Sequence, residues 1–335
     1  MTAYFNNFIG NKRITELLGQ AFNNQKISQA YLFLGPVSVG KKTLAKKFIQ
    51  GLFCQKSPAY LPCEKCAPCQ QVSKEIHPDV TWVQKDDSKR NIAIEQIRNL
   101  ISQLNQTAFL GGYKVGVVTE ADSLSIGAAN ALLKTLEEPT NKTLLILTAH
   151  NLASLPKTII SRVQILKFYP VPQLEIKKWL DKNFPEEKET ALASFLAQGS
   201  PGRGYRMLKD KNTIISIKEK SKVFLDLMPG SLNERFAYVD RLVASKKEKE
   251  SENMRQEILA LINIWQIVVR DLALMKFGFY DRIINVQEEN RLKRMAEATS
   301  VKKIVVINNC LNFTRGLLSS NVNQKLALDN LFLHI

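Results

Sequence analysis

The sequence predicts an α/β domain with a parallel sheet, followed by two helical domains. A strand, a glycine-rich loop and a helix succeed one another over residues 31–50. Apolar strands and helices then alternate as far as residue 148, and this alternation implies a parallel sheet with helices on both faces. After Pro170 and Pro172 the pattern is helical almost throughout. We expect three domains, at residues 1–168, 169–208 and 209–335.

The glycine-rich loop is the first candidate binding site. Its letters GPVSVGKKT place Gly35, Gly40 and Lys41 at the spacing of a P-loop, in which backbone N–H groups and a lysine hold a phosphate at the start of a helix. A P-loop has Ser or Thr directly after the lysine, so that a hydroxyl binds Mg²⁺. Here that position is Lys42, with Thr43 one residue late. Since a cation would repel the metal, we expect the loop to bind phosphate without supporting hydrolysis.

The second half of a nucleotide site follows the predicted strand at residues 113–118. In such sites an aspartate at the end of the strand binds Mg²⁺, and the glutamate after it polarises water. The glutamate is present as Glu120, but Thr119 stands where the aspartate belongs. Two metal ligands, one in each half of the site, are therefore replaced. We expect the chain to have little or no ATPase activity of its own.

Four of the five cysteines crowd into one loop, as Cys54, Cys63, Cys66 and Cys69. Three cysteines at two-residue gaps, with a fourth nearby, can close a tetrahedral thiolate shell around Zn²⁺. All four coordination positions are then filled, so we expect a structural metal and no zinc chemistry. The alternative is a set of buried free thiols, which rarely crowd among prolines and charged residues. His77 is expected to pack or cap rather than to bind the metal.

The composition is that of a basic globular protein. The 335 residues carry a formal net charge of +16 with a pI near 9.6, and 45% are hydrophobic. This charge points to an acidic partner, of which nucleic acid is the commonest, although a solvated surface with more Lys than Glu is the alternative. The lysines considered for phosphate contact belong to the helical part of the chain: Lys209, Lys211, Lys218, Lys220, Lys222, Lys246, Lys247 and Lys249.

No uninterrupted apolar run reaches the length of a transmembrane helix. The richest run, Ile258–Met275, contains Asn263, Gln266, Arg270 and Asp271. The N-terminus lacks the basic start and the apolar core of a signal peptide, and crowded cysteines that bind a metal suit a reducing compartment. We therefore expect a cytoplasmic protein with no membrane partner.

Several of these motifs together resemble the clamp-loader branch of the AAA+ proteins, as found in bacterial DNA polymerase III, and the resemblance covers essentially the whole chain. The most specific motifs are the cysteine spacing and the block AANALLKTLEEP at residues 128–139. The other motifs are Phe8–Gly10, Ala30–Pro36, His77–Val80, Ser161–Arg162, Gly199–Arg203 and the ending at 321–329. The chain departs from the family pattern at Val163, where Cys is usual, and at Gln29, which is often His.

The resemblance implies an AAA+ P-loop domain with an inserted zinc module at residues 54–69, a helical lid domain and a C-terminal helical collar domain that forms oligomers. It implies that the glycine-rich loop is the ATP-binding loop, and it leaves open whether ATP or ADP occupies that loop. It assigns the Walker B positions to Thr119 and Glu120, the sensor 1 position to Thr148 and the sensor 2 position to Arg203.

The resemblance also maps Arg162 onto the family's arginine finger, which reaches the γ-phosphate of a neighbouring subunit. On residue type alone, an arginine that caps a helix would be the commoner role, and only Ser161 and the family alignment favour the finger. Clamp loaders of this family are ring-like hetero-pentamers that use ATP to place a sliding clamp on primed DNA. With its metal ligands replaced, this chain is similar to the stator, the subunit that donates the arginine without hydrolysing ATP.

Two alternatives stay open. One is a motor subunit of the same loader, which hydrolyses its own ATP, and the replacement of its metal ligands by Lys42 and Thr119 argues against it. The other is a zinc-stabilised nucleic-acid-binding protein with a vestigial P-loop. That protein would bind primed DNA by itself, with an affinity that falls steeply as salt is added.

Overall fold

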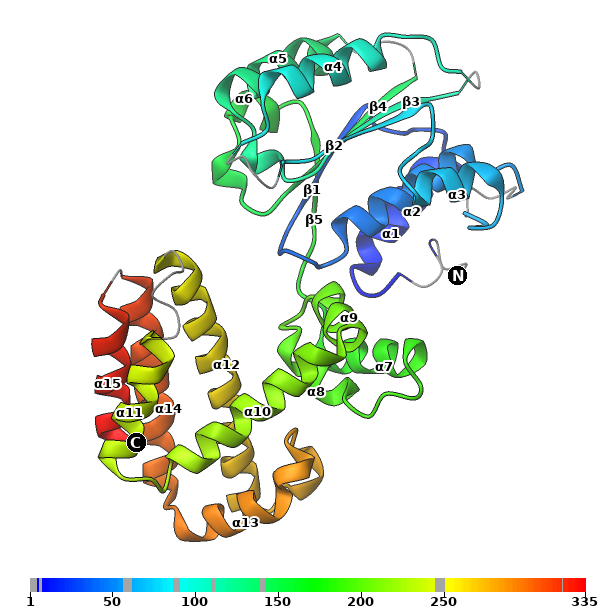
Figure 1. The fold of residues 1–335 in the computed structure, drawn as a ribbon. Helices are drawn as coiled ribbons and strands as arrows, with labels where there is room; N and C mark the ends of the chain where they lie inside the picture. The colour runs from blue at the N-terminus through cyan, green and yellow to red at the C-terminus, as the bar shows by residue number, and fades with distance from the viewer. Residues whose placement is uncertain are drawn as a thin grey trace. The chain divides into compact units, whose positions relative to one another are not determined.

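The computed structural model describes residues 5, 8–56, 62–86, 91–109, 112–138, 142–244, 251–320 and 322–335. The chain divides into two compact units, Met1–Arg206 and Met207–Ile335 (Figure 1). Each unit has its own hydrophobic core. Pro139, Asn321 and the lysines at 246, 247 and 249 lie outside the described residues. The division into three domains expected from the sequence remains a prediction.

A five-stranded parallel sheet forms the centre of the first unit. Its strands are β1 (Ala30–Leu34), β2 (Val80–Val83), β3 (Lys114–Val118), β4 (Thr143–Ala149) and β5 (Gln164–Lys167), in the order β2-β3-β4-β1-β5. Every pairing is parallel, which confirms the predicted α/β class. The central strands β1, β3 and β4 are buried along nearly their whole length, as expected where helices cover both faces.

Helices cover both faces of this sheet (Figure 1). One face carries α1 (Lys12–Asn23), α2 (Lys41–Phe53) and α3 (Ala67–Ser73), and the other carries α4 (Ile94–Leu104), α5 (Ile126–Glu137) and α6 (Lys157–Ile160). Aromatic rings fill the first interface. The ring centroid of Phe48 lies 4.6 Å from that of Phe22 and 5.6 Å from that of Tyr31. In the second interface a Cβ on Gly116 would lie 3.0 Å from Leu100 Cδ1, so glycine lets α4 approach β3 closely.

The first unit also contains α7 (Gln173–Asn183), α8 (Thr190–Leu196) and the start of α9 (Pro201–Lys209). The ring of Tyr205 lies 5.9 Å from Trp179 and 5.2 Å from Phe184, so α9 packs against the end of α7. Gly199 has a φ of +80° at the turn between α8 and α9, and a Cβ there would lie 2.4 Å from Pro170 Cβ. Glycine is therefore required at this turn.

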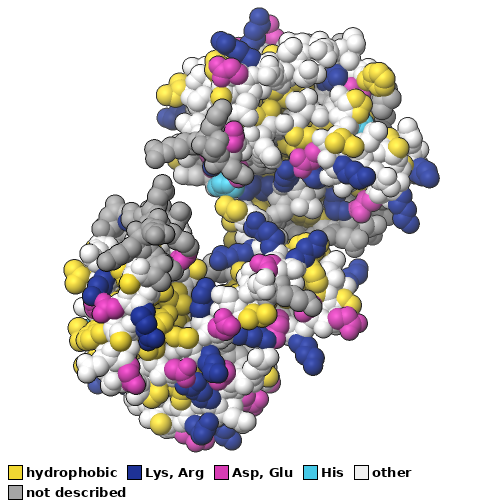
Figure 2. All heavy atoms as spheres, viewed as in Figure 1, with side chains coloured by type: hydrophobic (Ala, Val, Ile, Leu, Met, Phe, Trp, Pro, Cys, Tyr) yellow, Lys and Arg dark blue, Asp and Glu magenta, His cyan; other side chains and the backbone are white. Residues whose placement is uncertain are grey.

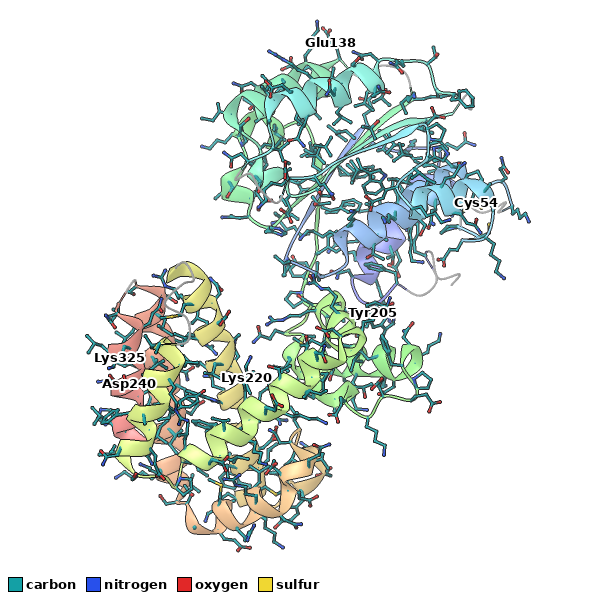
Figure 3. The ribbon with its side chains drawn as sticks, viewed as in Figure 1. Cys54, Glu138, Tyr205, Lys220, Asp240 and Lys325 are labelled. Carbon is teal, nitrogen blue, oxygen red and sulfur yellow. The ribbon has the colours of Figure 1, made fainter. Side chains whose placement is uncertain are left out.

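The second unit is all-helical. Its helices are α10 (Lys211–Leu227), α11 (Leu232–Ala244), α12 (Ser251–Lys276), α13 (Glu289–Ala298), α14 (Val301–Ser319) and α15 (Gln324–His334). Trp265 lies fully buried in their shared core and stacks on Phe224 at 4.9 Å. Asp240 on α11 and Lys325 on α15 form a surface ion pair at 2.5 Å (Figure 3). This confirms the helical C-terminal region that the sequence predicted.

The long helix α12 has the length and apolar composition of a membrane-spanning helix, which was not expected from its sequence. Over Met254–Lys276 it is long and apolar enough to cross a membrane, by length and composition only. However, 61% of its most apolar stretch is buried within the protein, and Ile262, Trp265 and Leu272 are fully buried. The core helix of a globular unit has the same properties, and we interpret α12 in that way. A cytoplasmic location remains a prediction.

Candidate functional site

A cavity of about 1190 Å³ opens at the carboxyl ends of β1, β3 and β4. Its walls come from the glycine-rich loop, the residues at the carboxyl ends of β2, β3 and β4, the N-terminal Phe8 and Ile9, Trp179 of α7, and the first turns of α9. Most of the nucleotide-site residues expected from the sequence line it: Gly40, Lys41, Lys42, Thr43, Thr119, Glu120 and Thr148. The fold therefore brings the two predicted halves of the site together.

Lys41 lies at the centre of the loop. Its Nζ donates hydrogen bonds to the carbonyls of Gly35 and Pro36, the latter at 2.8 Å, and lies 3.1 Å from His150 Nδ1. The side chain is almost fully buried. This burial lowers the pKa of Lys41 to about 8, although the negative charges of Asp122 and Glu120 favour the ammonium. Lys41 is therefore mostly charged at neutral pH, as phosphate binding requires.

Lys42, the cation expected from the sequence to repel a metal, is ion-paired. Its Nζ lies 2.7 Å from Glu75 Oε1 and 5.4 Å from the centroid of the Trp82 ring. The repulsion of a metal by Lys42 is therefore partly offset by a carboxylate, but no hydroxyl stands at this position. Thr43 is exposed on the wall of the cavity.

The residues after β3 form only part of the expected site. Thr119 Oγ1 donates to the carbonyl of Val83 at 3.2 Å, so its hydroxyl is directed to the neighbouring strand. Glu120 has a left-handed backbone with φ 56°, and its N–H donates to Thr148 Oγ1 at 3.1 Å. The structure thus joins Glu120 to Thr148, while Thr119 offers no carboxylate to a metal.

Two residues near Lys41 were missed in the sequence. His150 lines the cavity, and its ring Nδ1 contacts Lys41 Nζ. The backbone N–H of His150 donates to Asp122 Oδ2 at 3.4 Å. The other oxygen of Asp122 is buried and has no hydrogen-bond partner among the described residues. The sequence signal for both is their position just after an apolar strand, where the sheet edge collects polar side chains.

The start of α9 is hydrogen-bonded to the glycine-rich loop. Ser200 Oγ donates to the carbonyl of Val37 at 2.8 Å, and the N–H of Gly202 donates to the carbonyl of Ser38 at 3.0 Å. The guanidinium of Arg206 donates from Nη2 to the hydroxyl of Ser38. Tyr205, labelled in Figure 3, lines the cavity beside Arg206. The predicted lid segment therefore closes one side of the cavity.

Arg203, the residue assigned to the sensor 2 position, does not line this cavity. Its Nη1 lies 3.4 Å from Gln198 Oε1, at the turn before α9. Arg206, one helical turn further on, is the arginine of α9 that lines the cavity. The role assigned to Arg203 stays a prediction, and Arg206 is a second candidate that the sequence motif did not single out.

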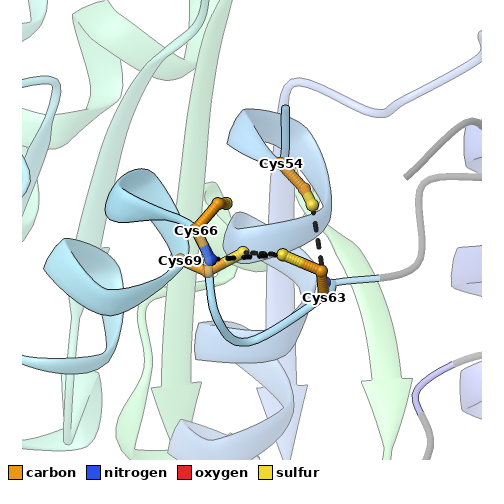
Figure 4. A group of neighbouring side chains, drawn as sticks. All are labelled: Cys54, Cys63, Cys66 and Cys69. Carbon is orange, nitrogen blue, oxygen red and sulfur yellow. Dashed lines mark hydrogen bonds between the residues drawn. The ribbon is translucent and has the colours of Figure 1, made fainter. Parts of the chain in front are cut away.

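The four cysteines predicted as metal ligands come together at the ends of α2 and α3 (Figure 4). Their sulfur atoms all lie within 4.8 Å of one another, with Cys63 and Cys69 at 4.0 Å. A tetrahedral Zn²⁺ with bonds of about 2.3 Å would set sulfur pairs about 3.8 Å apart. Four thiols at this separation fit such an ion, and Cys66 and Cys69 are shielded from solvent.

The backbone around the cysteines favours a thiolate at one of them. The N–H groups of Lys65 and Cys66 donate to Cys63 Sγ and lower the pKa of that thiol to about 6. Burial raises the pKa of Cys69, which a metal ion would reverse by binding its sulfur. His77 lies outside the cluster, where its Nδ1 accepts a hydrogen bond from the N–H of Asp79 at 3.1 Å and its ring packs on Phe53.

Arg162, the predicted arginine finger, follows α6 and does not line the cavity that holds Lys41. Its Nη2 lies 2.7 Å from Glu137 Oε1, and its Nη1 donates to the carbonyl of Thr158 and the hydroxyl of Ser161, both at 3.1 Å. The side chain remains 35% exposed. A group outside this chain can therefore reach the guanidinium.

On the one face shown in Figure 2, the described basic side chains are not gathered into one patch. Lys and Arg side chains are spread over both units on the face shown in Figure 2. Among the lysines considered for phosphate contact, Lys209, Lys220 and Lys222 are exposed and Lys218 is half-buried. Contact of these lysines with DNA stays a prediction.

The chain resembles known subunits of DNA polymerase III. A family model described as "DNA polymerase III, delta subunit" matches residues 10–172, which contain the glycine-rich loop, the four cysteines and Arg162. Over 183 residues the chain is 37% identical to the DNA polymerase III subunit delta' of Pseudomonas aeruginosa, a match that covers 54% of this chain and 56% of that protein.

Two relatives from Bacillus subtilis belong to different subunit types. The chain is 29% identical over 285 residues to the DNA polymerase III subunit tau, covering 84% of this chain and 50% of tau. It is 27% identical over 323 residues to the DNA polymerase III subunit delta', covering 96% of this chain and 94% of that protein. The chain thus spans about half the length of the Pseudomonas relative and of tau, and nearly all of the Bacillus delta' subunit.

Proposed function

Because the chain belongs to the clamp-loader branch of the AAA+ proteins, we propose that it is the stator of a bacterial DNA polymerase III clamp loader, a subunit of the delta-prime type. In this role it presents Arg162 to ATP held by a neighbouring subunit. It has little or no ATPase activity of its own. It takes part in the ATP-dependent loading of the sliding clamp onto primed DNA during replication.

The observation that carries this proposal is how the residues at the two metal-ligand positions are bonded. Lys42 is bound to Glu75, and the hydroxyl of Thr119 is bound to the backbone of β2. Lys42 has no oxygen to offer Mg²⁺, and Thr119 offers only a neutral hydroxyl turned to β2 in place of a carboxylate, whereas phosphoryl transfer needs Mg²⁺ held between the phosphates of ATP. The glycine-rich loop and Lys41 are kept, so the cavity can still take the phosphates of ATP or ADP.

The proposed partners follow from this role. They are motor subunits of the gamma or tau type, a delta subunit, and the sliding clamp and primed DNA that the assembled loader brings together. The assembly is a cytoplasmic hetero-pentamer. Zn²⁺, held by Cys54, Cys63, Cys66 and Cys69, stabilises the loop between α2 and α3, and all four ligand positions are taken by protein, so it does no chemistry.

The test is ATP turnover by the chain alone and by the loader reconstituted with motor subunits, delta subunit, clamp and primed DNA. We expect no turnover by the chain alone. In the loader, Arg162→Ala should lower the rate by roughly the share of the one site that loses its arginine, because the other sites keep theirs. Arg98→Ala, an exposed arginine on α4, is the matched control and should leave the rate unchanged.

A motor subunit is the second candidate, since the tau subunit is among the relatives and Lys41, Glu120 and Thr148 all line the cavity. The same experiment separates the two. Turnover by the chain alone that is lost in Glu120→Gln would identify a motor and overturn the stator proposal.

A further inference from the structure

Glu75 lies where the helix of the glycine-rich loop meets the four-cysteine module. Its Oε1 is 2.7 Å from Lys42 Nζ and 2.8 Å from Lys46 Nζ. The two lysines are four residues apart on α2, so they project from the same side of the helix. Both ammonium groups also lie over the indole ring of Trp82 on β2, at 5.4 and 5.7 Å from its centroid. One carboxylate and one aromatic face therefore hold both cations.

Glu75 is connected to the four-cysteine module through α3. Glu75 follows α3, the helix that carries Cys69. The carbonyl of Cys69 accepts a hydrogen bond from Gln50 Nε2 on α2 at 2.8 Å, and the bond is buried. The carbonyl of Ser73 accepts one from Lys46 Nζ, also at 2.8 Å. These contacts hold α3 along α2, with Cys69 near the start of α3 and Glu75 just after its end.

Lys42 is the residue through which a movement of Glu75 would reach the cavity. It lines the cavity directly after Lys41, on a flexible four-carbon side chain. While Glu75 binds it, its charge is offset and its position is restrained. Burial opposes the ionisation of Glu75, but hydrogen bonds from Lys42 and Lys46 and their charges hold the pKa of the carboxyl below its usual range. The carboxylate is thus ionised at neutral pH and the pair persists.

We propose that Glu75 is a positioning residue that links metal binding by the four cysteines to phosphate binding by the glycine-rich loop. When Zn²⁺ is bound, the module holds Glu75 on Lys42 and keeps this cation off the phosphates. When the metal leaves, α3 loosens and Lys42 is released. The cavity then binds a nucleoside diphosphate or triphosphate more tightly. The inference rests on the nucleotide site of the proposed function, but it is independent of the role of Arg162.

The first test measures how tightly the zinc-loaded full chain binds a fluorescent ADP analogue, in buffer without added Mg²⁺. We expect Glu75→Gln to bind it about five to ten times more tightly than wild type, because one more cation reaches the phosphates. In the Lys42→Met background, Glu75→Gln should change the affinity by less than about twofold. Unchanged binding by Glu75→Gln, with wild-type binding measurable, would overturn the proposal.

Glu64→Gln is the matched control. Glu64 lies between Cys63 and Cys66 and pairs with Lys47 of α2, so this substitution also removes a lysine–glutamate pair between the helix and the module. Lys47 does not line the cavity. Affinity should therefore stay at the wild-type value. Tightening equal to that of Glu75→Gln would show a general charge effect and contradict a special role for Glu75.

The second test removes the metal with a thiol-reactive mercurial and a chelator, measures the Zn²⁺ released, and repeats the titration after the reagents are washed out and the thiols restored. After metal removal, wild type should bind the ADP analogue as tightly as Glu75→Gln does. The affinity of Glu75→Gln itself should not increase when the metal is removed. Equal tightening of both proteins would show that the metal acts by another route. If no variant binds the analogue, this inference fails, while the Arg162 experiment still decides the proposed function.

Discussion

Arg162 is ion-paired with Glu137 of its own chain, with Nη2 2.7 Å from Oε1. Glu137 ends α5 and Arg162 follows α6, two helices that pack against each other. The guanidinium also donates to Thr158 and Ser161. The arginine is thereby held in one orientation while it remains partly exposed, so less side-chain entropy is lost when it meets a phosphate.

We predict that Glu137→Ala weakens the action of Arg162 without unfolding the protein. The pair lies at the surface, so its loss should change the free energy of unfolding by less than about 1 kcal/mol. The reconstituted loader should lose part of the ATP turnover that Arg162→Ala removes, because the arginine is no longer oriented. Glu138→Ala, at the exposed neighbour, serves as the control. Full turnover by Glu137→Ala would mean that the pair does not position Arg162.

We predict one Zn²⁺ per chain, bound by the four clustered cysteines. Cys69→Ser should abolish metal binding and lower the melting temperature, because part of the free energy of folding comes from metal binding. Zinc content by atomic absorption and thermal melting by circular dichroism measure these effects. Cys310→Ser, outside the cluster on α14, should keep the metal. A purified chain without metal, or full zinc content in Cys69→Ser, would contradict the assignment.

We predict that phosphate affinity falls as pH rises through about 8. Burial lowers the pKa of Lys41 to about 8, and only the charged ammonium attracts phosphate. Binding of the ADP analogue should thus be constant below this pKa and weaken above it, and Lys41→Met should bind weakly with no such step. Between pH 8 and the ordinary lysine pKa of 10.5, the unfolded chain binds more protons than the folded one at this residue. Lys41 therefore makes the free energy of unfolding rise with pH in that window.

We predict that Arg206 contributes more than Arg203 to nucleotide binding. Arg206 lines the cavity and bonds to Ser38 of the loop, whereas Arg203 contacts Gln198. Arg206→Ala should weaken binding of the ADP analogue about fivefold or more, as expected for loss of a charge-assisted contact, and Arg203→Ala by less than about twofold. The opposite order would restore Arg203 as the sensor 2 residue.

The sheet could largely be predicted from the sequence, because its central strands are continuous apolar runs. Runs of this kind at residues 31–34, 80–83, 113–118 and 143–148 lie within one residue of β1 to β4. β5 was missed. It is an edge strand paired with β1 alone, and two of its four residues, Gln164 and Lys167, are exposed. Such a strand has neither an apolar run nor a clear alternation.

The cysteine cluster could be predicted because its ligands are close in sequence and one ion requires them to converge. The partners of Lys42 and Arg162 could not. Glu75 is more than thirty residues from Lys42, and Glu137 ends α5 whereas Arg162 follows α6. Such pairs depend on which faces of two elements meet, and this is decided by packing. The same holds for Arg206, which meets Ser38 only because α9 is docked on the loop.

The most direct test of the stator role compares ATP turnover by the reconstituted loader containing wild type or Arg162→Ala, with each chain also assayed alone. The proposal predicts that neither chain alone hydrolyses ATP, and that the mutant loader assembles normally but turns over ATP more slowly, by roughly the share of the one site that loses its arginine. Unchanged turnover in the mutant loader, or hydrolysis of ATP by the isolated wild-type chain, would contradict it.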